Sequence, residues 1–261
     1  MEELVLGVVQ GLTEFLPVSS SGHLVIFSNV LGDGGEGTLL EVLLHFGTLA
    51  AVLTVYRKEI FALCKGLLRR EREATRRCGL IALACVPTGL IGILFKDPLE
   101  ALFESPFAVS CAMLFTAALL WSTRFIPKTR ETRPLDAKLA LLIGLIQGVA
   151  IVPGISRSGS TICGALHLGV DRKTAGDFSF LVSIPAVAGA VLLKVKDVAE
   201  AGIEASGVTA WTAAGVVAAF LVGWVALVWL LKFVRQGKMH LFAPYVLAVG
   251  VWGIFRFGGF I

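Results

Sequence analysis

Six apolar segments, each close to the length of a membrane-spanning helix, constrain the fold of this chain more than any other feature. They cover residues 39–56, 78–95, 106–126, 174–195, 208–231 and 241–257. A helix needs about 20 apolar residues to cross the hydrocarbon core of a bilayer. Charged residues make up only 16% of the 261-residue chain, whereas soluble domains carry about 25%. We therefore expect an all-α polytopic membrane protein.

Two further apolar stretches, residues 4–31 and 139–170, are interrupted at their centres by polar sequences that contain proline. The interruptions are LPVSSSGH in the first stretch and VPGISRSGS in the second. Each half is too short to span a bilayer alone, so both stretches are predicted to be re-entrant helical hairpins. Irregular backbone is tolerated at membrane depth only where protein or a wet cavity satisfies its polar groups. The two breaks should therefore line a cavity.

A short internal repeat relates the two interrupted stretches. GVVQG at 7–11 matches GLIQG at 144–148, and the same spacing aligns Ser19 with Ser156 and Ser21 with Ser158. The chain is then a single membrane domain, 1–261, with repeat one at 1–127, a linker at 128–138 and repeat two at 139–261. Each repeat holds one hairpin and three spans, and because three is odd, the second repeat enters the membrane from the opposite side. Such inverted repeats bring broken helices together near the bilayer midplane.

The distribution of Lys and Arg predicts how the chain is oriented. Eighteen of the 23 basic residues fall on one side of this layout, eight of them in the loop 57–77, and four fall on the other side. The remaining one is Arg157, inside the second break. Cytoplasmic loops are enriched in Lys and Arg, so 57–77, including the solvated run 69–77, is expected in the cytoplasm and both termini outside. Orientation also accounts for the net charge of +4, and no nucleic-acid partner is expected.

The first break carries a carboxylate within an apolar hairpin. Gln10 and Glu14 are four residues apart, so they share one helical face, and Pro17 ends that half-helix. Ionisable residues within a membrane usually have a function. Glu14 is therefore predicted to be a metal ligand or a general base, with Gln10 beside it. The structural alternative is a segment at the interface, with Glu14 in headgroup water.

Hydroxyl groups and a histidine follow Pro17. Ser19, Ser20 and Ser21 can cap the second half-helix, and His23 comes within one helical turn of the first two of them. Because its neighbours are hydroxyl groups and a carboxylate, His23 is predicted to have an acid–base role. A histidine that simply packs in an apolar helix is the alternative.

The second break supplies fixed positive charge. Gly154 permits close backbone approach, and the half-helix that follows can offer free amides to an anion. Arg157 adds a planar fork suited to phosphate. Four hydroxyl residues surround it, namely Ser156, Ser158, Ser160 and Thr161. A buried Arg must meet an anion; an ion pair with Glu14 would be enough, but this concentration of donors favours a phosphate or diphosphate ligand.

These two motifs resemble those of the undecaprenyl pyrophosphate phosphatase family, bacterial membrane enzymes linked to bacitracin resistance. QGLTEFLPVSSSGH carries the first motif and PGISRSGST the second, in the family's order. This chain has Gln10 where many members have Glu, which leaves Glu14 as the only carboxylate of that motif. The resemblance implies hydrolysis of undecaprenyl pyrophosphate to undecaprenyl phosphate and inorganic phosphate, which recycles the lipid carrier of cell-wall synthesis. It also implies a divalent cation, Mg²⁺ or Ca²⁺, and competition by bacitracin for the substrate.

The residues and the resemblance together assign roles. The candidate catalytic residues are Glu14, Ser20, His23 and Arg157, and the candidate metal ligands are Glu14 and Gln10. The candidate phosphate-binding residues are Ser19, Ser21, Gly154, Ser156, Ser158, Ser160 and Thr161. Ser20 activated by His23 is the favoured nucleophile, and a water activated by Glu14 or His23 is the alternative. We expect a multi-pass protein of the bacterial plasma membrane whose site faces the outer side. Its partners would be the bilayer and a polyprenyl diphosphate lipid, and a homodimer is left open.

A different class of function could use the same architecture. Inverted repeats with broken helices are typical of secondary transporters, so a transporter or flippase for a phosphorylated lipid or an organophosphate is the main alternative. A structural scaffold would leave the cluster around Arg157 unexplained. Weaker candidates for the cavity wall are His45, Asp177 and Ser183.

Overall fold

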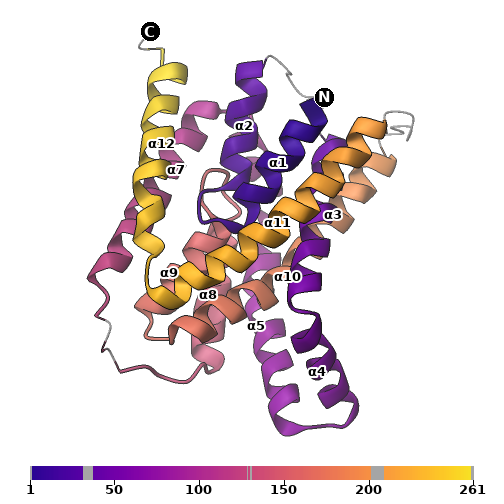
Figure 1. Ribbon diagram of the computed structural model, residues 1–261, viewed down its shortest axis with the longest axis vertical. Helices are drawn as coiled ribbons and strands as arrows, with labels where there is room; N and C mark the ends of the chain where they lie inside the picture. Colours follow the sequence, from indigo (N-terminus) through magenta and orange to yellow (C-terminus); the bar gives the residue numbers. More distant parts are fainter. Residues whose placement is uncertain (1, 32–37, 128, 130, 201–208, 260–261) are drawn as a thin grey trace.

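A computed structural model describes residues 2–31, 38–127, 129, 131–200 and 209–259 (Figure 1). This part of the chain contains helices and their connections but no strand. The α-helices are α1 (Glu2–Phe15), α2 (Ser20–Leu31), α3 (Thr38–Val55), α4 (Arg57–Leu68), α5 (Arg72–Leu94), α6 (Lys96–Phe103), α7 (Pro106–Ser122), α8 (Ala137–Val149), α9 (Arg157–His167), α10 (Arg172–Glu200), α11 (Ala210–Gln236) and α12 (Ala243–Phe257). Two 3-10 helices, η1 (Thr123–Phe125) and η3 (Met239–Phe242), continue α7 and precede α12. The all-α prediction is confirmed.

Five helical segments are long and apolar enough to cross a membrane. They are Arg72–Leu94, Pro106–Phe125, Arg172–Leu193, Ala210–Gln236 and Met239–Phe257. These segments match five of the six predicted spans, as expected of a polytopic membrane protein. The remaining span, predicted at 39–56, forms α3, whose apolar part, Val42–Val55, is shorter than the others. Residue 208 of the fifth predicted span and residues 128 and 130 of the predicted linker lie outside the described residues.

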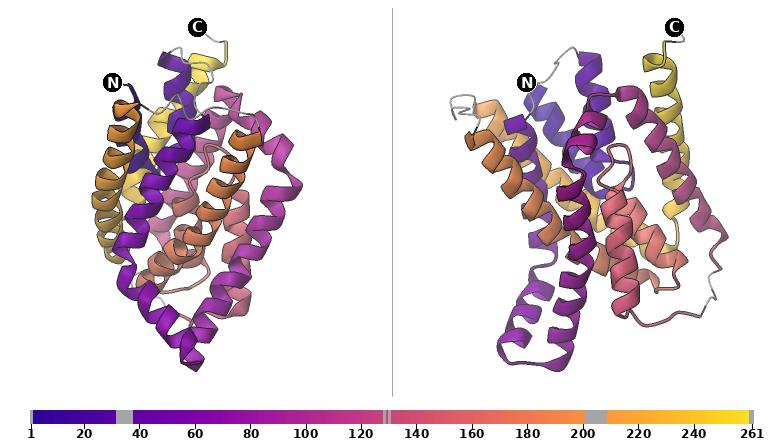
Figure 2. Two further views of the ribbon diagram at one scale, coloured as in Figure 1. Left: turned by 90° about the vertical axis from the view of Figure 1, so that its right-hand side faces the viewer. Right: turned by 180° about the vertical axis from the view of Figure 1, so that it is seen from behind.

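The predicted loop at 57–77 is largely helical, and this part of the sequence prediction was wrong. Residues 57–68 form α4, and 72–77 form the first turns of α5, so only 69–71 connect them. The connection is closed by the Glu71 amide, which donates to the Gly66 carbonyl oxygen at 2.8 Å. Arg and Glu are good helix formers, so a charged run can continue a helix beyond the apolar span. The resulting helical pair projects from one end of the molecule (Figure 2).

The first and last described helices reach the opposite end of the molecule. α1 begins and α12 ends at one end, and α4 lies at the other (Figure 1). This separation agrees with the sequence-based prediction that both termini lie on one side and 57–77 on the other.

Both predicted breaks interrupt helices where proline and glycine occur. α1 ends at Phe15 and α2 begins at Ser20, and α8 ends at Val149 and α9 begins at Arg157. The first break passes through Ser19 at φ 71°, a left-handed conformation that is uncommon for a residue with a side chain. The two breaks lie near the middle of the molecule (Figure 1).

The second break depends on Gly154, whose φ is +92°. A β-carbon there would collide with the Val109 carbonyl oxygen of α7. Thr116, also on α7, donates through its hydroxyl to the Gly154 carbonyl oxygen at 2.9 Å and accepts from the Ser156 amide at 3.0 Å. The neighbouring helix therefore satisfies the backbone groups that the break releases from helical bonding.

The helices around the breaks pack in matching pairs. α1 lies along α11 and α8 lies along α5, while α3 contacts α10 and α7 contacts α12. The approach of α1 to α11 is close, because a β-carbon on Gly11 would lie only 2.9 Å from the Ala219 carbonyl oxygen. Small residues at helix interfaces in membranes permit such approach. The long helices thus hold each broken helix in place.

Candidate active site

An ion pair joins the two broken helices at their tips. Nη2 of Arg157, the first residue of α9, donates to Oε1 of Glu14, near the end of α1, at 2.7 Å. The two side chains are 17% and 9% exposed. Arg157 follows directly on the N-cap of α9, where Ser156 Oγ accepts from the Gly159 amide at 3.1 Å. The sequence prediction that these two breaks meet therefore agrees with the geometry.

Three further polar groups lie around Oε2, the second oxygen of the Glu14 carboxylate. Ser20 Oγ donates to Oε2 at 2.7 Å, and Gln10 Nε2 donates to the same oxygen at 3.1 Å. His45, on α3, brings its Nε2 to within 3.8 Å of Oε2. Glu14 is therefore the centre of the site, and its two oxygens connect the first break to the second.

His23 lies apart from Ser20 in its hydrogen bonding. Its Nδ1 bonds to the Ser19 carbonyl oxygen and its Nε2 to the Tyr245 hydroxyl of α12, both at 2.8 Å. The side chain is buried. The prediction paired His23 with Ser20, but both ring nitrogens bond elsewhere and the Ser20 hydroxyl bonds to Glu14. The ionisable group that contacts the Ser20 hydroxyl is therefore Glu14, whereas His23 contacts the Ser19 turn and α12.

Several of the predicted phosphate-binding hydroxyl groups form hydrogen bonds within the protein. Ser158 Oγ donates to the Phe15 carbonyl oxygen at 2.9 Å, so α9 supports the end of α1. Thr161 Oγ1 donates to the Arg157 carbonyl oxygen at 2.8 Å and also bonds to Ser179 Oγ on α10. Ser19 Oγ accepts from the Gly22 amide at 3.2 Å and lies 3.3 Å from Ser21 Oγ. These contacts fix the backbone of the two breaks and the start of α9.

Three buried polar atoms of the site have no hydrogen-bonding partner within the described part of the chain. They are Arg157 Nη1, Ser160 Oγ and Gln10 Oε1. Buried polar groups are nearly always paired, so these atoms are candidates for contact with a ligand. Arg157 Nη1 and Ser160 Oγ can donate to a phosphoryl oxygen, and Gln10 Oε1 is a neutral oxygen beside a carboxylate.

The side-chain oxygens of Gln10 and Glu14 are of the chemical type that a hard divalent cation takes, although the Gln10 amide nitrogen is the atom that contacts Glu14. Mg²⁺ and Ca²⁺ take oxygen ligands, and Mg²⁺ is commonly held by one or two carboxylates together with substrate phosphates and water. Within the residues that the structure describes, no cluster of three or more His, Cys, Asp or Glu side chains forms a complete cage. A cation here would therefore need the substrate to complete its coordination.

Sequence reasoning missed residues that come from distant helices. Tyr245, Thr116 and Ser179 each bond to a residue of the breaks. Tyr245 is one of only two tyrosines in the chain, which was the one available signal. Of the weaker candidates, His45 reaches Glu14, whereas Asp177 accepts from the Tyr56 hydroxyl at 3.2 Å and Ser183 donates to the Phe180 carbonyl oxygen of its own helix.

The fold and the site define a polytopic helical membrane protein with a buried acid–arginine–serine centre. The family model described as bacitracin resistance protein BacA matches residues 3–252, and the chain belongs to this family. It is 45% identical over 267 residues to an undecaprenyl-diphosphatase of Desulfatibacillum aliphaticivorans, with 96% of each chain covered. It is 42% identical over 261 residues to an undecaprenyl-diphosphatase of Alkaliphilus metalliredigens (strain QYMF), with 95% of this chain and 94% of the relative covered.

Proposed function

We propose that this protein is an integral-membrane phosphatase that hydrolyses undecaprenyl pyrophosphate to undecaprenyl phosphate and inorganic phosphate. Family membership and the names of the relatives support the reaction. The observation that carries it is the 2.7 Å hydrogen bond from the Ser20 hydroxyl to Glu14 beside the Glu14–Arg157 pair. The reaction recycles the lipid carrier of cell-wall synthesis and confers bacitracin resistance, since bacitracin would compete for the same diphosphate lipid.

Arg157 would hold the phosphoryl group that is transferred. Nη2 of its guanidinium donates to Glu14, which leaves Nη1 to donate to a phosphoryl oxygen. Ser160, three residues further along α9, has a hydroxyl that likewise lacks a partner among the described residues. Donors fixed in advance stabilise the charge of a phosphoryl-transfer transition state without reorganising. The N-terminus of α9 adds its dipole to the same end.

Glu14 would act as the general base, in one of two ways. In the first, Glu14 takes the Ser20 proton while Ser20 Oγ attacks the terminal phosphorus, and the bond to the bridging oxygen breaks to release undecaprenyl phosphate. Water then hydrolyses the phosphoserine to inorganic phosphate and restores Ser20. In the second, Glu14 takes the proton from a water that attacks the same phosphorus directly. His23 would serve both by fixing the Ser19 turn through its bond to the Ser19 carbonyl oxygen.

A divalent cation would be held by Glu14 and by Gln10 Oε1, the neutral oxygen that lacks a partner among the described residues. When bound, Mg²⁺ or Ca²⁺ would neutralise charge on the diphosphate. Because Gln10 carries no charge, the chain contributes a weaker cation site than a pair of carboxylates would, and the substrate would supply the remaining ligands.

The helix pairs support an inverted repeat of six spans and two re-entrant hairpins. Under that arrangement α1 is equivalent to α8, and α5, the second span of repeat one, is equivalent to α11, the second span of repeat two. Each broken helix packs on the second span of the other repeat, α1 on α11 and α8 on α5. The first spans, α3 and α10, contact each other, and so do the third spans, α7 and α12. A two-fold relation between the repeats produces this pairing. The bounds 1–127 and 139–261 divide the chain accordingly.

The basic residues favour an orientation in the bacterial plasma membrane with α4 on the cytoplasmic side. The substrate's polyprenyl chain would stay in lipid, and its diphosphate would reach the site from the outer side. A homodimer is compatible with this arrangement.

The deciding experiment measures phosphate release from a prenyl diphosphate by the detergent-purified protein, with and without Mg²⁺ or Ca²⁺. Cation-dependent release supports the phosphatase. A protein that binds or moves the lipid between leaflets and releases no phosphate is instead a transporter or flippase.

A further inference from the structure

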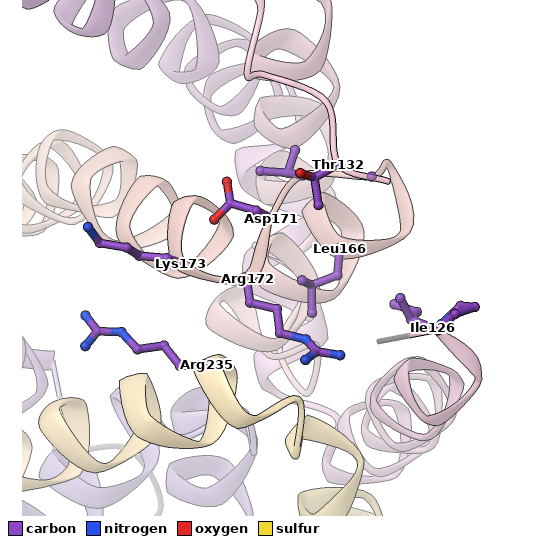
Figure 3. A pocket seen from close by; sticks show the side chains of 10 residues that line it. Ile126, Thr132, Leu166, Asp171, Arg172, Lys173 and Arg235 are labelled. Atoms are coloured by element: carbon purple, nitrogen blue, oxygen red, sulfur yellow. The ribbon is translucent and has the colours of Figure 1, made fainter. Parts of the chain in front are cut away.

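A cavity of about 310 Å³ lies away from the Glu14–Arg157 site (Figure 3). It is bounded by the segment after η1, the end of α9, the start of α10 and the last turn of α11. Leu166 lines it from α9, and lies roughly 14 Å along that helix from Arg157, at 1.5 Å per residue. The cavity is therefore separate from the proposed diphosphate site. All its walls come from segments on the side that is rich in Lys and Arg.

Three basic side chains line this cavity, which we call the basic cavity. Arg172 and Lys173 come from the start of α10, and Arg235 comes from the end of α11 (Figure 3). None of the three forms an ion pair or a side-chain hydrogen bond with another described residue. The Arg172 guanidinium lies against Gly237, where a β-carbon would come within 2.8 Å of its Nη2.

The acidic groups nearby leave most of this positive charge uncompensated. Asp171 lines the basic cavity, but its Oδ1 accepts from the Thr174 amide at 3.0 Å and so caps α10. Burial raises the pKa of Asp171, but its hydrogen bonds with Thr174 and with neighbouring backbone amides together lower the pKa below its usual value. Asp177 interacts electrostatically with Arg235 and Lys173. Its Oδ1, however, accepts a hydrogen bond from the Tyr56 hydroxyl. Three cations and one carboxylate thus line the cavity, and the charged ends of Lys173 and Arg235 point to one side of it while the Arg172 guanidinium points to the other (Figure 3).

The position of these cations on their helices also points to an anion. A basic residue in the last turn of a helix is favourable, because it offsets the negative end of the helix dipole, and this accounts for Arg235. Arg172 and Lys173 occupy the first turn of α10, where the dipole disfavours positive charge. An anion bound at the start of α10 would be favoured both by the helix end and by the three side chains.

We propose that the basic cavity binds the phosphate group of an anion, either a phospholipid headgroup or free phosphate. Leu166 and Val170 are buried and line the cavity beside the basic side chains, so apolar surface adjoins the charge, as suits a phosphate group that carries acyl chains. Basic pockets between membrane helices on the cytoplasmic side bind anionic headgroups in general. This binding is independent of hydrolysis, so the inference does not rest on the proposed reaction.

The test compares two charge-matched variants in an Arg157→Lys background, which keeps a positive charge beside Glu14 but removes the planar fork that would bind phosphate at the proposed active site. The cavity variant is R172Q/K173Q/R235Q. The control is K138Q/K232Q/K238Q, which removes three exposed charges from the same side outside the cavity. Thermal unfolding in a non-ionic detergent is followed while dioctanoyl phosphatidylglycerol, inorganic phosphate or dioctanoyl phosphatidylcholine is titrated.

We expect the cavity variant to bind phosphatidylglycerol at least tenfold more weakly than the control, with phosphatidylcholine giving little stabilisation to either. The single variants R172Q and R235Q should each show part of the loss, which covers failure of the triple variant to fold. Cavity-dependent binding of inorganic phosphate alone would assign the site to the free anion. Equal binding of both anions by the cavity and control variants would overturn the proposal.

Discussion

Glu14 and Arg157 are joined by a 2.7 Å contact between Oε1 and Nη2, although 143 residues separate them in the chain. Both side chains are largely buried. Removing one partner of a buried pair leaves an uncompensated charge, which costs about 3–5 kcal/mol. The same contact orients the guanidinium toward the proposed phosphate position. The pair therefore affects both the stability of the protein and the proposed hydrolysis, and substitutions can separate these two effects.

Arg157→Lys should lower phosphate release by about 10²–10³-fold, the usual cost of losing a fixed donor to the transition state. Lysine keeps the charge near Glu14 but cannot contact both the carboxylate and a phosphoryl oxygen with a planar fork. Stability in detergent should change little. The measurement is phosphate release at saturating cation, with the exposed Arg124→Lys as control. A lysine variant that retains a third or more of wild-type turnover would rule out the fork's role.

A double-mutant cycle measures how much the interaction between Glu14 and Arg157 contributes to the free energy of unfolding. Arg157→Ala and Glu14→Ala should each destabilise the protein, and the double variant should be less destabilised than their sum, because neither charge is left alone. We expect a coupling of about 1–3 kcal/mol in thermal or denaturant unfolding. If the destabilisation of the double variant equals the sum of the two single effects, the two side chains do not stabilise each other.

Glu14→Gln should abolish phosphate release, because an amide can neither take a proton from Ser20 nor hold a cation by charge. Gln10→Glu should instead lower the cation concentration needed for half-maximal activity, since it adds a second carboxylate beside Glu14. The measurement is activity as a function of Mg²⁺ and Ca²⁺ concentration. An unchanged cation requirement in Gln10→Glu would place the cation elsewhere.

Ser20→Ala and Ser21→Ala separate the two versions of the hydrolysis. If Ser20 is the nucleophile, substrate labelled in the terminal phosphate should label the wild-type protein and Ser21→Ala in a single turnover, but not Ser20→Ala. If water attacks directly, no variant is labelled, and Ser20→Ala loses activity only through the weakened position of Glu14. Label that persists in Ser20→Ala would exclude this serine as the nucleophile.

Tyr245→Phe should cost about 1 kcal/mol of stability, the typical net value of one hydrogen bond, and leave turnover within a few-fold of wild type. Its hydroxyl bonds only to His23 among the described residues, and we propose that His23 acts by holding the Ser19 turn. His23→Gln should accordingly lose much less activity than Glu14→Gln. The reverse order of activities would restore His23 as the general base.

Gly154→Ala should prevent the second break from forming, because its φ of +92° is strained for alanine and its β-carbon would collide with the Val109 carbonyl oxygen. The matched control is Gly189→Ala in α10, where a β-carbon meets nothing within 4 Å. The first should reduce folded protein and the second should not, as measured by size-exclusion profiles after extraction. Equal yields would show that the break can rearrange.

The sequence by itself determined the helical class, five of the spans, the two breaks and the residues at their tips. Length and hydropathy suffice for these features, since a bilayer imposes a fixed length on each helix and proline and glycine end it locally. The residues Glu14 and Arg157 were also identifiable, because charge within an apolar hairpin is costly and therefore conspicuous.

Only the tertiary structure decided which partner each group takes. Spacing along α2 placed His23 near Ser20, but a 2.8 Å bond from Tyr245, 222 residues away, directs the imidazole elsewhere, and Ser20 bonds to Glu14 instead. Likewise Ser158 and Thr161 support neighbouring backbone rather than standing free, and the basic cavity combines side chains from two helices. Hydropathy and helical spacing describe one helix at a time, whereas hydrogen-bonding partners depend on how separate helices pack.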